Sequence, residues 1–272
     1  MNSTFSFIGT GNMGGAILKA ACGIIDPDSI YIADSDRAKA LTLGSELGCN
    51  VMEGNLQAVE SADFVILCVK PQIIGTVLDE IAPVLRKREA DGNPAVLVSI
   101  AAGVSISKMR SHIGAKQPIV RVMPNTPALI GKGLMIIAGD DSVRENKIAA
   151  LEQMLSCCGE TMRLSENLMD QATTASSCSP AFVYLFIEAL ADAGVYTGLT
   201  RENAEKMAAS AVLGAASMVL ETGMKPGELK DMVSSPNGST IRGVASLEKS
   251  GFRGAVIKAF LAAYERNTEM GK

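Results

Sequence analysis

The chain has 272 residues, a formal net charge of -4, and a hydrophobic fraction of 47%. This length and composition exclude an intrinsically disordered protein, because ample apolar surface is available to form a core. Apart from the short run Arg86, Lys87 and Arg88, lysine and arginine are scattered along the chain, so no basic stripe can neutralise the phosphates of a nucleic acid. We therefore expect a globular protein with no nucleic-acid partner.

The cysteines indicate the cellular compartment in which the protein works. The six cysteines include the adjacent pair Cys157 and Cys158, and none has the spacing of a zinc site, so free thiols in a reducing cytosol fit best. The first residues run into the strand-like FSFIGTG without a basic region and cleavage site, so we expect no secretory signal. No apolar stretch that is free of charges is long enough to span a membrane, so we expect no membrane partner.

His112 is the single histidine of the chain. A Ser-His-Asp triad or a multi-histidine metal site would have to be built around this one residue, and it matches no such spacing. The sequence therefore predicts a cytoplasmic protein without a metal site. If it is an enzyme, its reactivity comes from a cofactor.

The first half of the chain alternates β-rich runs with helix-like segments, a pattern typical of parallel sheets. The predicted strands are 5–9, 29–34, 63–69, 95–100, 118–124, 133–139 and 160–164. The predicted helices are 12–22, 36–47, 73–85 and 142–155, with Gly23 and Gly48 as the predicted stops of the first two.

After about Ser165 the strand signals end, and alanine-rich helical patterns such as EKMAASAVLGAASMVLETG follow. We predict an α/β fold with an amino-terminal Rossmann-type parallel-sheet domain over residues 1–164 and an all-helical domain over residues 165–272. The helices are apolar on more than one side, and a small domain cannot bury them all. This favours a homo-oligomer with interlocking helices, and tight packing within one subunit is the alternative.

A glycine motif follows the first strand. Gly9, Gly11 and Gly14 form the GxGxxG pattern of dinucleotide-binding folds. Gly9 permits a tight turn, Gly11 lets the backbone approach a pyrophosphate, and Gly14 allows close packing of helix on strand. The following helix then presents free N–H groups and a partial positive charge to the phosphates.

Asp34 ends the second predicted strand, about twenty residues after the motif, where a carboxylate binds a ribose 2′-hydroxyl. It would repel a 2′-phosphate and so favours NADH. Ser35 and Arg37 follow and offer a phosphate site if Asp34 turns away, and Asp34 capping the next helix is a further alternative. The choice between NADPH and NADH stays open.

Five motifs occur in order over essentially the whole chain: GTGNMGGAI, CVKPQ, RVMPNTPALIGKG, SSCSPAFVYLFIEALADAGV and SSPNGSTIRGV. Together they make the chain closely resemble pyrroline-5-carboxylate reductase. The resemblance implies a Rossmann domain and a helical domain that forms an intertwined homodimer, often assembled into a larger ring of dimers. It also implies reduction of 1-pyrroline-5-carboxylate to L-proline, the last step of proline biosynthesis, with NADPH or NADH.

The resemblance also implies site residues. Asp34 and Ser35 match the position that selects the 2′ substituent, and the imino acid would lie against SSPNGST, with Ser239 and Thr240 at the matching positions. The implied cofactor contacts are Ile8, Gly9, Thr10, Gly11, Asn12, Met13, Asn55, Val69, Lys70 and Ala101, with Asn55 in a loop before the third long strand.

Two motifs depart from the family pattern, which commonly reads SGSGPAY and SPGGTT. Ser177 and Ser179 replace glycines here, Phe182 replaces a tyrosine, and Asn237 replaces a glycine. Asparagine tolerates a left-handed backbone, so we expect the SPNGST turn to survive. The missing tyrosine hydroxyl puts any role of that group in doubt.

The chemistry assigns tasks to the SPNGST segment. A helix beginning near Ser239 can receive a carboxylate on its N–H groups and on the Gly238 backbone, without an arginine. The Thr240 hydroxyl is the candidate catalytic group, as a hydrogen-bond partner of the imine nitrogen. The alternative is that Ser239 and Thr240 simply cap the helix.

Other interpretations also stay open. Lys70 holds a phosphate, orients water near the nicotinamide, or is a surface lysine at a strand end. Pro180 breaks or kinks a helix and exposes Ser176 and Cys178 to a pocket, or it makes a packing kink only. Hydroxyacid-type dehydrogenases place a lysine on the first long helix of the second domain, and none lies between Asp170 and Thr200. A cofactor-binding protein without turnover is a further alternative.

Overall fold

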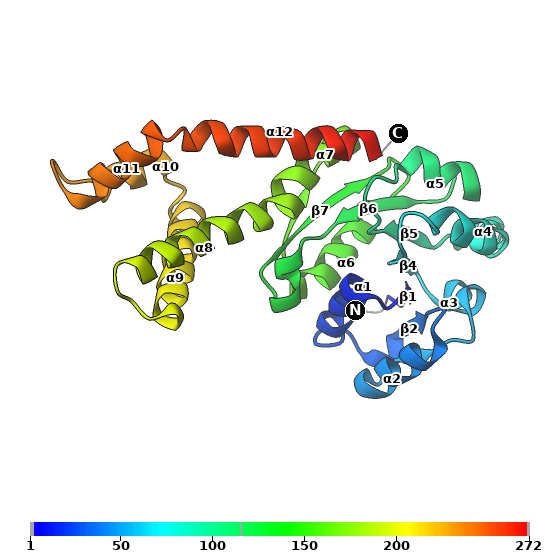
Figure 1. Ribbon diagram of the computed structural model, residues 1–272. Helices are drawn as coiled ribbons and strands as arrows, with labels where there is room; N and C mark the ends of the chain where they lie inside the picture. Colours follow the sequence, from blue (N-terminus) through cyan, green and yellow to red (C-terminus); the bar gives the residue numbers. More distant parts are fainter. Residues whose placement is uncertain (1–2, 115, 271–272) are drawn as a thin grey trace. The chain divides into compact units, whose positions relative to one another are not determined.

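The computed structural model describes residues 3–114 and 116–270, which divide into two compact units. The first unit reaches Ser177 and includes the chain from Tyr264 onward, and the second is Cys178–Ala263. Figure 1 labels the helices and strands of both. The border between two domains that the sequence predicts after residue 164 stays a prediction.

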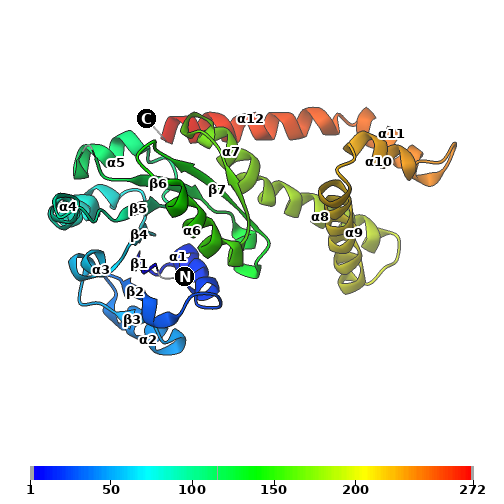
Figure 2. The same ribbon diagram turned by 180° about the vertical axis from the view of Figure 1, so that it is seen from behind.

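An eight-stranded sheet forms the centre of the first unit, with strand order β3-β2-β1-β4-β5-β6-β7-β8 (Figures 1 and 2). The strands are β1 (Phe5–Ile8), β2 (Ile30–Ala33), β3 (Asn50–Val51), β4 (Phe64–Leu67), β5 (Val96–Ser99), β6 (Ile119–Met123), β7 (Gly133–Gly139) and β8 (Gly159–Arg163). The first six run parallel in the 3-2-1-4-5-6 order of dinucleotide-binding folds. β7 is antiparallel to β6, and β8 is parallel to β7. The predicted Rossmann-type sheet is confirmed.

The central strands are buried on both faces. Phe5 and Phe64 are register partners on β1 and β4, and their rings stack with centroids 4.9 Å apart in the core that lies under α1 and α6. Val65 and Leu67 of β4 point to the other face, into the core formed with α4 and α5. Such two-sided burial explains why these strands read as continuous apolar runs in the sequence.

Helices cover both faces of the sheet. α1 (Asn12–Ala21), α2 (Arg37–Leu47) and α6 (Glu145–Leu155) pack on one face, and α3 (Asn55–Ser61), α4 (Ile74–Ala90) and α5 (Ile106–Ile113) pack on the other. The short α7 (Met169–Thr173) follows the last strand. The predicted stop of α2 at Gly48 is confirmed, since this residue has a left-handed backbone with φ +75°.

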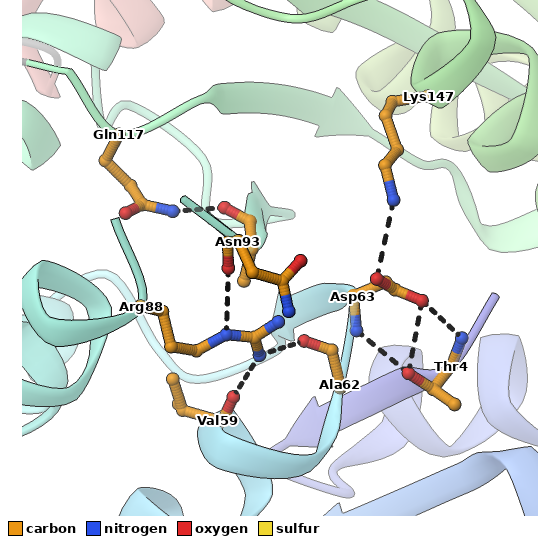
Figure 3. A network of polar contacts seen from close by, with 9 residues as sticks. Thr4, Val59, Ala62, Asp63, Arg88, Asn93, Gln117 and Lys147 are labelled. Atoms are coloured by element: carbon orange, nitrogen blue, oxygen red, sulfur yellow. Dashed lines mark hydrogen bonds and ion pairs between the residues drawn. The ribbon is translucent and has the colours of Figure 1, made fainter. Parts of the chain in front are cut away.

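α4 continues through Pro83 and past its predicted end at residue 85, as far as Ala90. Leu85 is fully buried, and Arg88 on the last turn donates hydrogen bonds to the carbonyl oxygens of Val59 and Ala62. Figure 3 shows this network, in which Arg88 also reaches the Asn93 carbonyl at 3.2 Å. These tertiary contacts hold a helix end that local sequence does not specify.

The second unit is helical throughout, as predicted. It consists of α8 (Ser179–Tyr196), α9 (Arg201–Thr222), α10 (Pro226–Met232), α11 (Ser239–Lys249) and the first part of α12 (Phe252–Met270). A π-helical turn, Thr174–Cys178, precedes α8, and Pro180 lies in the first turn of α8. The chain stays helical through this point, so a break at Pro180 is wrong. The exposure expected for Ser176 is wrong, because its hydroxyl is buried and bonds the Ala172 carbonyl.

Little of the second unit is buried within one chain. Ala191, Ala204 and Ala208 form its small core, whereas many large apolar side chains are exposed, among them Tyr184, Leu185, Leu213 and Leu220. The helical stretch Glu166–Tyr196 is also long and apolar enough to span a membrane. A single helix of this kind is only weak evidence of a membrane span.

The stacked pair Phe5–Phe64 gives a direct test of the sheet. We expect Phe64→Ala to lower the free energy of unfolding by about 3–5 kcal/mol, because it leaves a cavity in a close-packed core. Leu41→Ala, at a side chain that is 49% exposed, is the control and should change it by less than about 0.5 kcal/mol. Equal urea midpoints for the two variants would contradict this placement of the core.

Candidate functional site

The loop between β1 and α1 has the geometry of a phosphate-binding turn. Gly9 adopts φ +94°, which permits the tight turn after the strand. A Cβ on Gly14 would lie 2.6 Å from the Cβ of Cys68, so helix and strand pack as closely as the motif predicts. A Cβ on Gly11 would meet no atom within 4 Å, which leaves the backbone open to a ligand. The residues present therefore fit a dinucleotide.

Asp34 closes this loop from the end of β2. Its Oδ2 accepts hydrogen bonds from the Thr10 N–H at 2.6 Å and from the Thr10 hydroxyl at 2.8 Å, and its Oδ1 accepts from the Asp36 N–H at 2.9 Å. The cap of α2 is Asp36, which accepts from the Lys39 N–H, so the interpretation of Asp34 as the helix cap is wrong. Asp34 instead clasps the glycine loop.

The clasp favours an ionised carboxylate. Partial burial raises the pKa of Asp34, but hydrogen bonds from Thr10 and Asp36, together with the charge of Lys39, outweigh it and hold the pKa below its usual value. The charge is thus built into the loop and does not depend on a bound ligand.

The other predicted cofactor residues of the first unit stand mostly at the carboxyl ends of neighbouring strands. Ile8 ends β1, Val69 and Lys70 follow β4, and Ala101 follows β5. β1 lies between β2 and β4, where the strand order reverses, and open α/β sheets bind ligands in the crevice at such a point. The structure therefore brings these residues to one edge of the sheet.

Three further predicted residues lie around this edge. Asn12 and Met13 open α1, and Ser35 follows Asp34 and is exposed, as is Lys70. The prediction that Asn55 lies in a loop is wrong, because Asn55 is the first residue of α3. Its amide donates to Glu80 Oε2 at 2.9 Å.

An open cavity of about 580 Å³ continues from the glycine loop between α1 and α2. Its lining includes Thr10, Gly11, Lys39 and Thr42. Sequence reasoning missed Lys39, although its position in the first turn after the acidic residue places a cation near Asp34. The cavity adds positive charge to the side of the loop where a nucleotide would lie.

Asn125, which follows β6, is engaged within the first unit. Its amide nitrogen donates to the Ser176 carbonyl at 3.1 Å, and its Oδ1 accepts from the Leu134 N–H at 2.9 Å. Ser177 adds a bond from its hydroxyl to the Pro124 carbonyl at 2.9 Å. Asn125 therefore clamps the end of β6 to the π-helical turn.

In the second unit, Gly238, Ser239 and Thr240 form the beginning of α11. Gly238 is the N-cap, and in the part of the chain that the structure describes no side chain makes a capping hydrogen bond to this helix. The interpretation of Ser239 and Thr240 as caps is thus wrong, and both side chains are exposed. Asn237 has φ +58°, the one left-handed residue other than glycine in residues 3–114 and 116–270, so the expected tolerance of asparagine is confirmed.

Comparisons with known proteins agree along the whole chain. Residues 166–270 match the family model for pyrroline-5-carboxylate reductase dimerisation, and residues 4–103 match that of NADP oxidoreductase, coenzyme F420-dependent. The pyrroline-5-carboxylate reductase of Escherichia coli K12 is 40% identical over 274 residues, with 100% of both chains covered.

This chain belongs to the pyrroline-5-carboxylate reductase family.

Two solved structures of the family extend the likeness to three dimensions. The pyrroline-5-carboxylate reductase of Coxiella burnetii superposes with a TM-score of 0.92 at 31% identity and covers 100% of both chains. The enzyme of Plasmodium falciparum, solved with NADP bound, superposes with a TM-score of 0.85 at 33% identity, and the match covers 100% of this chain and 99% of that one.

Among residues 3–114 and 116–270, no group of three or more His, Cys, Asp or Glu side chains is arranged to hold a metal.

The clasp predicts a pH dependence of stability. A carboxylate with a lowered folded pKa stabilises the fold above its unfolded pKa of about 3.9, and this contribution is lost as the pH falls through the folded value. We expect Asp34→Asn to unfold at a lower urea concentration than the wild type at pH 7, with the gap shrinking below about pH 4. Asp141→Asn, at an exposed turn, should show no gap. A constant gap for Asp34→Asn would contradict the clasp.

Proposed function

We propose that this reductase binds its nicotinamide cofactor on the glycine loop of the first unit and its imino acid at the first turn of α11. As a pyrroline-5-carboxylate reductase, it reduces 1-pyrroline-5-carboxylate to L-proline with NAD(P)H, the last step of proline biosynthesis. The observation that carries the cofactor assignment is the open, positively charged helix start at Gly11, clasped by Asp34.

The cofactor would be held by backbone more than by side chains. The N–H groups at the start of α1 face the pyrophosphate position, and Asp34 and Ser35 lie where the 2′ substituent of the adenosine ribose is selected. Val69, Lys70 and Ala101 border the reactive end at the edge of β4 and β5. When bound, the reduced nicotinamide supplies the hydride, and the protein supplies orientation and electrostatics.

The imino acid presents a carboxylate and a C=N bond. The uncapped N–H groups of Ser239 and Thr240 are suited to the carboxylate because the helix start carries a partial positive charge. The Gly238 N–H already donates to the Ser235 carbonyl at 3.0 Å and shapes the turn that presents them. The exposed Thr240 hydroxyl is our candidate to hydrogen-bond the imine nitrogen. An imine that arrives protonated needs no strong acid from the protein.

The direct test is to mix the protein with NADPH or NADH and 1-pyrroline-5-carboxylate. We expect absorbance at 340 nm to fall in step with the formation of proline. Cofactor binding without oxidation would identify a protein that binds the nucleotide but does not turn over.

Thr240→Ala tests the imine contact. We expect kcat/KM to fall about 10- to 100-fold, the worth of one hydrogen bond to a charged group, while the dissociation constant of NADPH stays within twofold. Thr240→Ser keeps the hydroxyl and should retain most of the activity. Equal losses for the two variants, or a parallel loss of NADPH affinity, would contradict this role.

Asp34→Ala tests the choice of cofactor. Removal of the carboxylate should raise the ratio of kcat/KM for NADPH to that for NADH, because a 2′-phosphate is no longer repelled. It should also weaken both cofactors, since the bonds to Thr10 are lost. An unchanged ratio would mean that the carboxylate acts only on the loop.

We also propose a soluble, cytoplasmic homodimer or a larger ring of dimers. The six cysteines form no disulfide within residues 3–114 and 116–270, which suits a reducing compartment. A cavity of about 670 Å³ on the second unit is lined by apolar residues such as Phe182, Leu185 and Phe252, which a second copy would cover. We expect native mass spectrometry to give an even multiple of 28.4 kDa, and Leu185→Glu to yield monomers. A monomeric wild type would contradict the proposal.

A further inference from the structure

Two thiols far apart in the sequence meet at the end of α1. Cys22 is the C-cap of α1, and Cys49 follows the left-handed Gly48 that ends α2. Their Sγ atoms lie 3.3 Å apart, although 27 positions separate the residues. An ion pair between Lys19 Nζ and Glu46 Oε1, at 2.9 Å, holds the same two helix ends together.

The two thiols differ in access. Cys49 is buried at 8% exposure, whereas Cys22 is partly exposed and is followed by the exposed Gly23 and Ile24. A small reagent from solvent therefore reaches Cys22 first. The S–S bond of a disulfide is about 2.05 Å long, so closing the pair needs roughly an ångström of movement.

The electrostatics favour the same order of events. The hydrogen bond between the two thiols lowers the pKa of Cys22, against the opposing effect of burial. The same bond and burial raise the pKa of Cys49. Because the thiolate is the nucleophile, Cys22 attacks and Cys49 stays protonated in reserve.

We propose that Cys22 and Cys49 form a reversible dithiol–disulfide site that exchanges with low-molecular-weight disulfides of the glutathione disulfide type. The Cys22 thiolate attacks one sulfur of the reagent, forms a mixed disulfide and expels the first thiolate, which takes up a proton. Cys49 then loses its proton, attacks the Cys22 sulfur and expels the second thiolate. The two protein thiols are oxidised, and the reagent is reduced to two thiols.

The adjacent pair Cys157 and Cys158 is a natural comparison, because it lies in the same unit and its Sγ atoms are 3.8 Å apart. Neighbouring Cα atoms are about 3.8 Å apart, below the usual range for a disulfide. The Cys157 thiol also bonds the Met154 carbonyl, and Cys158 is fully buried. We expect this pair to stay reduced.

The new bond would brace the nucleotide-binding half. It would tie the end of α1 to the turn between α2 and β3, and cross-linking distant positions restricts the unfolded chain. The glycine loop lies at the other end of α1, about 15 Å away for a helix of ten residues. Oxidation should thus raise thermal stability and leave NADPH affinity within twofold.

The test incubates the full-length protein in glutathione buffers of rising disulfide content, blocks free thiols with N-ethylmaleimide and maps the peptides by mass spectrometry. We expect a linked peptide pair containing Cys22 and Cys49, two hydrogens lighter than the sum of the free peptides. The unfolding temperature should rise with this species and return after dithiothreitol. Cys157→Ser should form the same link.

Cys49→Ser separates the two steps of the exchange. It should accumulate glutathione on Cys22 and show no rise in unfolding temperature, because the resolving thiol is missing. The proposal is overturned if the wild type forms no linked peptide in any buffer, if the link joins other cysteines, or if Cys49→Ser carries no glutathione on Cys22.

Discussion

The hydrogen bonds between Asp34 and Thr10 set the geometry on which the nucleotide site depends. They connect the end of β2 to the turn after β1, the two strands beside the point where the sheet order reverses. Gly9 allows the turn, and Gly14 lets α1 approach the strand behind it. The start of α1 is thereby fixed with its N–H groups open, which is the form that an anionic ligand requires.

The helical half follows a different constraint. Its helices expose many large apolar side chains and bury few, so its stability as a lone unit is limited by uncovered surface. A surface of this kind is covered in an assembly of copies, and the match of this region to a dimerisation family has the same physical basis. The uncapped start of α11 also lies on this half, so the proposed substrate site and the proposed oligomer contacts share one small scaffold.

Much of the fold could be predicted from the sequence, because apolar runs such as FVIL are buried on both faces and Gly48 marks a helix end. The two-residue β3 and the seven-residue α3 carry too little periodicity to be detected. The glycine motif identified the loop, but the partner of Asp34 depends on which strands become neighbours. For the same reason, the meeting of Cys22 with Cys49 could not be predicted.

A crystal structure of the protein with NADP⁺ and proline tests the central claim most directly. The account predicts pyrophosphate oxygens within about 2.7–3.2 Å of backbone nitrogens at the start of α1. It also predicts the proline carboxylate on the Ser239 turn, beside a nicotinamide ring of the same or another subunit. A nucleotide bound away from the glycine loop, or a Ser239 turn remote from every nicotinamide, would contradict it.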